Sequence, residues 1–154
     1  MKKVAVFPGS FDPITVGHVD IIERSVGLFD QVYVAVGINS QKKYLFPIEK
    51  RLAWLKKVFE PYPSIKVDSY EGLTTKYCEK VGANFILRGI RSAGDFEYEK
   101  TIAHLNNAMD PDLETLLILA KPEYSSISST IVREIIKANG DVSKFVPEEI
   151  DVSL

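Results

Sequence analysis

The sequence predicts an α/β fold in which a five-stranded parallel sheet is covered by helices on both faces. Short apolar, β-branched runs alternate with longer segments whose apolar residues recur every three or four positions. Each run is bounded by Gly, Pro, Asn, Asp or Ser, which are typical of strand ends. Strict alternation of strands and helices favours a parallel sheet with right-handed crossovers, and ligands then bind at the carboxyl ends of the strands.

The elements follow in order along the chain. Strands are expected at residues 3–7, 31–38, 64–70, 84–89 and 114–120. Helical spacing predicts four helices between them, with apolar residues at Val19, Ile22, Val26 and Phe29; Ile48, Leu52, Leu55 and Phe59; Leu73, Tyr77 and Val81; and Ile102, Leu105 and Met109. A fifth helix follows the last strand, with Ile131 and Ile135 on one face and Ser128-Ser129-Thr130 as its cap. The tail after Gly140 is expected to be irregular or to form a short helical turn.

Length and composition indicate one globular domain over residues 1–154. The chain is 45% hydrophobic and 26% charged, with a net charge of −2 and both signs interspersed. A nucleic-acid-binding protein is usually more basic. The single cysteine, Cys78, has no disulfide partner, which fits a reducing compartment, and no segment has the pattern of a signal peptide or membrane span. We therefore expect a soluble, cytoplasmic protein.

The stretch GSFDPITVGH, Gly9 to His18, joins the first strand to the first helix. Thr15 stands at the expected N-cap, three residues before His18. Free N–H groups at such a helix start favour a phosphate anion. The stretch lacks both the Gly-Lys-Ser/Thr ending of a P-loop and the Gly-x-Gly-x-x-Gly pattern of a dinucleotide-binding loop. The residues alone leave a phosphate site and a simple turn about equally supported.

Three further loops at the same predicted edge favour a phosphate site. Lys42 and Lys43 follow the second strand, Arg88 lies at the tip of the fourth, and Arg91 comes three residues later. Five Ser or Thr hydroxyls lie within residues 124–130, before the last helix. Each group alone has an ordinary explanation, such as a solvated lysine, a surface ion pair with Asp95 or Glu97, or a helix cap. Their convergence on one edge favours polyanion binding.

At these residues the chain resembles the phosphopantetheine adenylyltransferase family of the nucleotidyltransferase superfamily. GSFDPITVGH is similar to the family signature G-[ST]-F-D-P-x-T-x-G-H, and RGIRSAGDFEYE and YSSISSTIVREI match the family in order and spacing. Thr15 replaces the first histidine of the superfamily motif H-x-G-H, as it does in this family. The tail after Pro147 is shorter than is common in the family.

The resemblance implies a Rossmann-like domain that transfers the adenylyl group of ATP to 4'-phosphopantetheine, giving dephospho-coenzyme A and pyrophosphate. It also implies Mg²⁺ with the ATP, no separate metal-ligating residues, and a homohexamer. The acceptor phosphate would attack the α-phosphorus in line, without a covalent enzyme intermediate. Such chemistry depends on positioning and charge stabilisation, which fits a sequence without a nucleophile-base set.

The resemblance also implies residue roles. His18, Lys42 and Arg91 are the expected catalytic residues, with His18 stabilising the transition state. The acceptor would contact Ser10, Lys42, Thr74, Arg88 and Asn106, with Thr74 contributing its backbone. The expected ATP-binding residues are Gly9, Ser10, Phe11, His18, Gly89, Ile90, Arg91, Glu99, Tyr124, Ser125, Ser126, Ile127, Ser128, Ser129 and Thr130.

Two alternatives remain open at this stage. A superfamily enzyme with the same first loop could adenylylate nicotinamide mononucleotide or cytidylylate glycerol phosphate, although Thr15 and the RGIR and DFEYE segments argue against both. A catalytically silent module could instead sense ATP or coenzyme A, but every phosphate-binding position of the matched motifs is filled.

Overall fold

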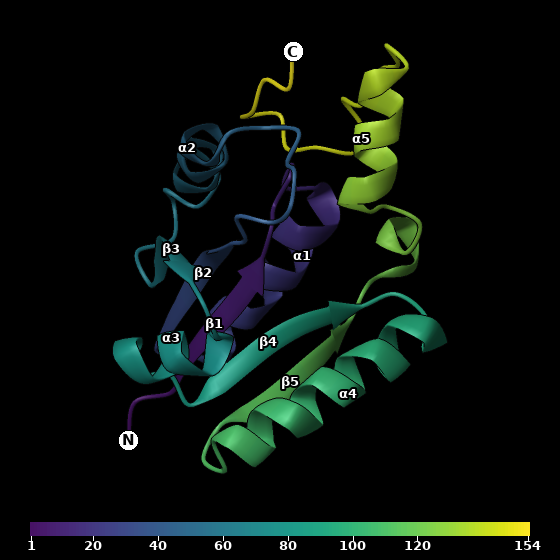
Figure 1. The fold of residues 1–154 in the computed structure, drawn as a ribbon. Helices are drawn as coiled ribbons and strands as arrows, with labels where there is room; N and C mark the ends of the chain where they lie inside the picture. Colours follow the sequence, from purple (N-terminus) through teal and green to yellow (C-terminus); the bar gives the residue numbers. More distant parts are fainter.

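The computed structural model describes residues 1–154 and contains one parallel sheet with strand order β3-β2-β1-β4-β5 (Figure 1). The strands are β1 (Val4–Gly9), β2 (Gln31–Ile38), β3 (Ile65–Glu71), β4 (Phe85–Ile90) and β5 (Glu114–Leu119). The α-helices are α1 (Val16–Ser25), α2 (Ile48–Val58), α3 (Thr74–Val81), α4 (Ala93–Met109) and α5 (Ser129–Lys137). Two short 3-10 helices are η1 (Val26–Leu28) and η2 (Pro122–Tyr124). The predicted fold class is confirmed, and the strand ends differ from the prediction by at most two residues.

Helices cover both faces of the sheet, because successive strand residues point to opposite sides. In β1, Ala5 and Phe7 join the larger core cluster with residues of α1, α2 and α5. Val6 joins the smaller cluster with Tyr77 and Cys78 of α3. Helix α4 lies over β4 and β5 on the α3 side of the sheet (Figure 1).

Two caps predicted from the sequence are confirmed. The Thr15 Oγ1 accepts the N–H of His18 and begins α1, and the Ser128 Oγ accepts the N–H of Ile131 and begins α5. Each cap satisfies one of the N–H groups that a helix start leaves without a partner. Both helix starts are therefore fixed at the carboxyl edge of the sheet.

The predicted inner faces of two helices are wrong. In α4, Ile102, Leu105 and Met109 are 39%, 57% and 53% exposed, and the one buried residue is Glu99. Helix α4 packs over Arg88 in β4, so its inward residue is an acid that pairs with the arginine. In α5 the buried residues are Val132 and Ile136; of the predicted pair, Ile135 is partly buried against the larger core, whereas Ile131 is exposed.

The predicted pattern for the first helix also runs too far. Helix α1 ends at Ser25, and Val26 belongs to η1. The tail after Gly140 is irregular, as expected, and it buries Val142, Val146 and Ile150 against the larger core. No helix combines the length and the apolar character that crossing a membrane requires.

Candidate functional site

Two cavities meet at the carboxyl edge of the sheet. The first cavity, of about 410 Å³, lies between β3, α3, α4 and the start of the GSFDPITVGH loop. The second cavity, of about 380 Å³, lies between that loop, β4 and the starts of α1 and α5. Residues that line both cavities are Pro8, Gly9, Ser10, Lys42, Arg88, Tyr98 and Glu99. A group bound in one cavity can therefore reach a group bound in the other.

The loop from Gly9 to Thr15 is fixed by buried polar contacts with the segment after β2 and with α2. The Asp12 carboxylate accepts the N–H groups of Leu45 and Phe46, at 2.8 and 2.9 Å. Arg51 donates to the Ser10 carbonyl at 2.7 Å and to the Phe46 carbonyl at 3.0 Å. These contacts tie the lysine loop after β2 to the loop after β1, and they set the position from which Lys42 reaches the site.

Phe11 occupies an uncommon backbone conformation within this loop. Its φ is 47°, in a region that non-glycine residues seldom adopt. Its ring is buried and packs edge-on against His18, with ring centroids 5.1 Å apart. A Cβ at Gly9 would lie 3.0 Å from the Phe11 ring, so glycine is needed where the two approach. Because the Phe11 side chain faces the core, we expect any contact of this residue with a ligand to be made by its backbone.

His18 is fixed as a neutral hydrogen-bond donor. Its Nδ1 accepts the N–H of Thr15 at 3.0 Å, which leaves the ring proton on Nε2. Burial lowers the pKa of His18, and the positive charges of Arg88 and Arg91 act in the same direction, so that together they bring it from 6.5 to about 4. The imidazole therefore carries no charge at neutral pH and lines the second cavity as a donor.

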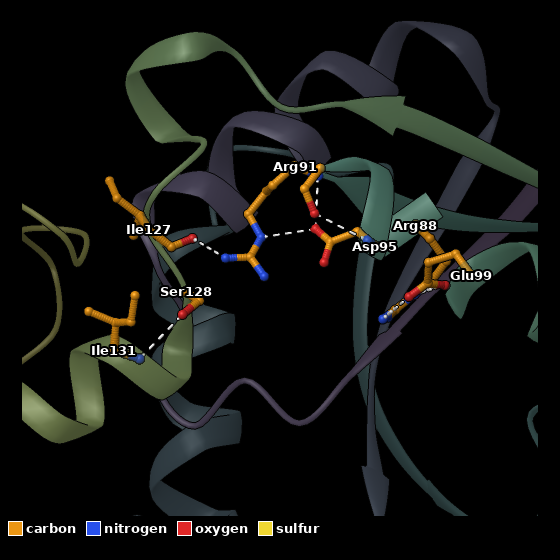
Figure 2. Close-up of polar contacts among 8 residues, drawn as sticks. Arg88, Arg91, Asp95, Glu99, Ile127, Ser128 and Ile131 are labelled. Atoms are coloured by element: carbon orange, nitrogen blue, oxygen red, sulfur yellow. Dashed lines mark hydrogen bonds and ion pairs between the residues drawn. The ribbon is translucent and has the colours of Figure 1, made fainter. Parts of the chain in front are cut away.

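Arg88 is held by two elements on either side of it. Its Nε and Nη2 donate to the two carboxylate oxygens of Glu99, both at 2.9 Å, and its Nη1 donates to the Pro8 carbonyl. The acid of this ion pair is buried, with Glu99 6% exposed, whereas the Arg88 side chain is 31% exposed and open to the cavities (the contact is drawn in Figure 2). Three of the five guanidinium N–H donors are used within the protein, and two remain for a ligand.

Arg91 is oriented by a second acid and by the loop before α5. Its Nε lies 3.2 Å from the Asp95 Oδ2, and its Nη1 donates to the Ile127 carbonyl at 3.4 Å (Figure 2). The Asp95 carboxylate also accepts the backbone N–H of Arg91. The ion pairs predicted as the ordinary explanation therefore exist, with Glu99 rather than Glu97 as the partner of Arg88.

Two helix starts present unused donors to the second cavity. The N–H groups of Gly17, Ser129 and Thr130 have no hydrogen-bond acceptor in the chain, and all three residues line this cavity. Such groups, together with the helix dipoles, favour an anion. Lys42 adds an exposed positive charge, and its Nζ donates to the Ser10 Oγ at 3.4 Å.

The structure gathers most of the residues that the sequence analysis selected. All five residues expected to bind the acceptor line the first cavity. Twelve of the fifteen residues expected to bind ATP line the second cavity, whereas Ile90, Ser125 and Ser126 do not. No group of three or more His, Cys, Asp or Glu side chains is arranged to hold a metal ion.

Several lining or supporting residues were not selected from the sequence. Arg51 and Arg133 position the first loop, and Tyr70 and Tyr98 line the first cavity. The sequence gives one signal for each tyrosine: Tyr70 lies near the end of a strand, and Tyr98 lies within DFEYE. Arg51 acts on backbone carbonyls, and such contacts leave no motif, whereas Arg133 lies within the quoted segment YSSISSTIVREI but was not selected.

We expect NMR to show a neutral His18 with its proton on Nε2. In a His104→Gln variant the remaining imidazole signals belong to His18, and they should titrate with a midpoint of about pH 4. Because folding lowers this pKa from 6.5, the free energy of unfolding should decrease as the pH falls below 6.5. Above pH 6.5 the neutral His18 should leave it unchanged. A midpoint near 6.5, or a proton on Nδ1, would contradict the assignment.

Comparison with known proteins agrees with the site. The Cytidylyltransferase-like family matches residues 6–135. The phosphopantetheine adenylyltransferase of Flavobacterium psychrophilum is 51% identical over 152 residues, which is 99% of each chain. The enzyme of that name from Desulforamulus reducens is also 51% identical, covering 95% of this chain and 91% of the relative. That of Bacteroides thetaiotaomicron is 44% identical, covering 99% of this chain and all of the relative.

Solved structures show the same fold at lower identity. A protein of Vibrio parahaemolyticus described as a nicotinate-nucleotide adenylyltransferase superposes with a TM-score of 0.67 at 20% identity, covering 95% of this chain and 94% of that chain. The lipopolysaccharide core biosynthesis protein of Thermoplasma volcanium gives a TM-score of 0.56 at 19% identity, covering 79% and 98%. These two likenesses concern the fold alone. The identities over nearly the full length show that the chain belongs to the phosphopantetheine adenylyltransferase family, within the cytidylyltransferase-like nucleotidyltransferases.

Proposed function

We propose that the chain transfers the adenylyl group of ATP to 4'-phosphopantetheine, giving dephospho-coenzyme A and pyrophosphate. One observation carries the proposal beyond family membership: the two cavities meet at Ser10, Lys42 and Arg88. A nucleotide in the second cavity and a phosphate ester in the first would bring their phosphates together at these residues. Such an arrangement fits a transfer between two bound substrates.

In this reaction an oxygen of the acceptor phosphate attacks the α-phosphorus of ATP in line. The new O–Pα bond forms as the bond from the α-phosphorus to the bridging oxygen breaks, and that oxygen leaves with pyrophosphate. The protein supplies position and positive charge rather than a nucleophile. Lys42 lines both cavities, so its ammonium can contact both the acceptor phosphate and the α-phosphate, whereas Arg88 is held in place by Glu99 and Pro8.

His18 donates a hydrogen bond from its Nε2–H to a phosphate oxygen, and the imidazole stays neutral in this role. The free N–H groups at the starts of α1 and α5 bind the leaving phosphates, and Arg91 holds the nucleotide from the β4 side. Fixed donors of this kind stabilise charge as it develops, because they need no reorientation during the step. Glu99 acts through Arg88 in this arrangement, since both of its oxygens bind the guanidinium.

Magnesium enters as the counter-ion of ATP, held by the phosphates rather than by a cluster of protein acids. For assembly we propose a homohexamer; the number of subunits follows from the family resemblance, and the exposed apolar residues Leu105 and Met109 on α4 support association between copies. A cytoplasmic location is proposed on the basis of the single cysteine alone.

We expect pyrophosphate release from ATP and magnesium only when 4'-phosphopantetheine is the acceptor. Parallel reactions should contain nicotinamide mononucleotide with ATP, and glycerol 3-phosphate with CTP, because related enzymes share the first loop. If only another acceptor supports turnover, the proposed role of His18 stands, but the proposed 4'-phosphopantetheine site is wrong. ATP binding without turnover in any reaction would favour a sensor.

Replacing His18 by Ala should lower kcat about 10²–10³-fold, the usual cost of losing one fixed donor to a developing oxyanion. The KM for ATP should change little, because the helix N–H groups and Arg91 remain. His104→Ala is the matched control, since His104 lines neither cavity and is exposed. Unchanged turnover in His18→Ala would remove this residue from the mechanism.

Replacing Arg88 by Lys should raise the KM for 4'-phosphopantetheine by about tenfold or more, because an ammonium cannot bind Glu99, Pro8 and a phosphate together in one plane. The KM for ATP should stay within about threefold. Arg24→Lys is the control, because Arg24 pairs with Asp20 in α1 and lines neither cavity. If only the KM for ATP rises, Arg88 serves the nucleotide instead.

A further inference from the structure

Two hydroxyl groups form a pair in the wall of the first cavity. The Oη of Tyr70, near the end of β3, lies 2.8 Å from the Oγ1 of Thr74, at the start of α3. Both residues are part-buried, and both line the cavity. The family resemblance assigns a backbone contact to Thr74 and gives no role to Tyr70, so the pair is an additional feature of this site.

Packing fixes the Tyr70 ring in its place. The ring stacks on Tyr77 with centroids 4.7 Å apart and an interplanar angle of 19°. Tyr77 is itself held, because its hydroxyl donates to the Asp68 carboxylate at 2.8 Å. On the neighbouring strand, a Cβ at Gly37 would lie 3.3 Å from the Tyr70 Oη, so glycine provides the space for this hydroxyl. A tyrosine clamped in this way keeps its hydroxyl at one point of the cavity wall.

The number of protons in the pair determines what it can bind. Each hydroxyl carries one proton, and the mutual hydrogen bond uses one of the two. Burial raises the pKa of Tyr70, so the phenol keeps its proton at neutral pH. Whichever oxygen donates within the pair, one O–H remains without a partner in the chain. The pair therefore offers one donor to a hydrogen-bond acceptor in the cavity.

The rest of the first cavity suits a long polar chain attached to a phosphate. Lys42 and Arg88 lie at the junction of the two cavities, whereas Ile102 and Asn106 of α4 line the first cavity only. A side-chain amide, an apolar residue and a hydroxyl pair together match a chain that carries amide groups. An amide carbonyl is the group that accepts the remaining O–H proton.

We propose that Tyr70 and Thr74 act as one hydrogen-bonding unit that recognises a carbonyl group in the acceptor arm, with Tyr70 as a specificity-determining residue. This inference rests on the proposed function, because it concerns the acceptor of the same reaction. It adds a side-chain role for Thr74 and a binding role for Tyr70.

Steady-state kinetics of Tyr70→Phe, Thr74→Val and the double variant test the proposal. Each single variant should raise the KM for 4'-phosphopantetheine about tenfold, because the remaining hydroxyl loses the partner that orients it and the hydrogen bond to the ligand is weakened or lost. The kcat and the KM for ATP should stay within about twofold, because the phosphate contacts remain. In the double variant the KM for 4'-phosphopantetheine should also rise about tenfold rather than a hundredfold, since the effects of residues that act as a unit are not additive. Thr74→Ser, which keeps the hydroxyl, should restore the wild-type KM.

Tyr33→Phe is the matched control. Tyr33 packs edge-on against Tyr77 with centroids 6.4 Å apart, and it lines neither cavity. This variant therefore removes a tyrosine hydroxyl from the same aromatic cluster and keeps the ring. It should leave both KM values unchanged. Thermal unfolding of every variant shows whether the fold is retained. If Tyr70→Phe fails to fold, the comparison of Thr74→Val with Thr74→Ser decides the question.

Three results would overturn the proposal. They are an acceptor KM within twofold of the wild type in Tyr70→Phe or Thr74→Val, a parallel rise of both KM values, and a multiplicative loss in the double variant. Wild-type turnover with 4'-phosphopantetheine is measured first. Its absence would reject the proposed function itself, whereas normal wild-type turnover with unaffected variants would reject only the role of the hydroxyl pair.

Discussion

The ion pair between Arg88 and the buried acid Glu99 is the interaction on which the rest of the site depends. It joins β4 to α4, and the additional bond from Arg88 to the Pro8 carbonyl joins both to β1. A buried acid without a partner is costly, so each half of the pair requires the other. The pair also explains why α4 turns Glu99 toward the sheet and leaves apolar residues exposed. One interaction thus sets the position of a helix and the direction of the guanidinium that we propose binds the acceptor phosphate.

Burial keeps His18 neutral, and the positive charges of Arg88 and Arg91 act in the same direction. Thr15 holds the imidazole proton on Nε2. A charged imidazole would add attraction for phosphate but would also have to be maintained against two nearby cations. A neutral donor avoids this cost and is already oriented. The site therefore places its permanent charges on arginine and lysine, and it uses histidine for direction.

Much of this arrangement could be predicted from the sequence, because it depends on local patterns. The strands, the caps at Thr15 and Ser128 and the convergence of basic loops on one edge all follow from short-range rules. The inner face of α5 could not be predicted, because Ile131 with Ile135 and Val132 with Ile136 have the same helical spacing. The partner of Arg88 could not be predicted either, since Asp95, Glu97 and Glu99 all lie within reach in sequence. Distinguishing these alternatives requires the tertiary packing.

Residues that support the site from behind escape sequence reasoning for a related physical reason. Arg51 fixes the first loop through the carbonyls of Ser10 and Phe46, and every residue type presents the same carbonyl. The contact therefore requires an arginine at position 51 but no particular residue type at positions 10 and 46. Adenylyl transfer needs such supports, because it relies on donors that are in place before charge develops. In this chain the acids, carbonyls and caps that hold the cations and His18 are thus as much a part of the catalytic arrangement as the groups that face the phosphates.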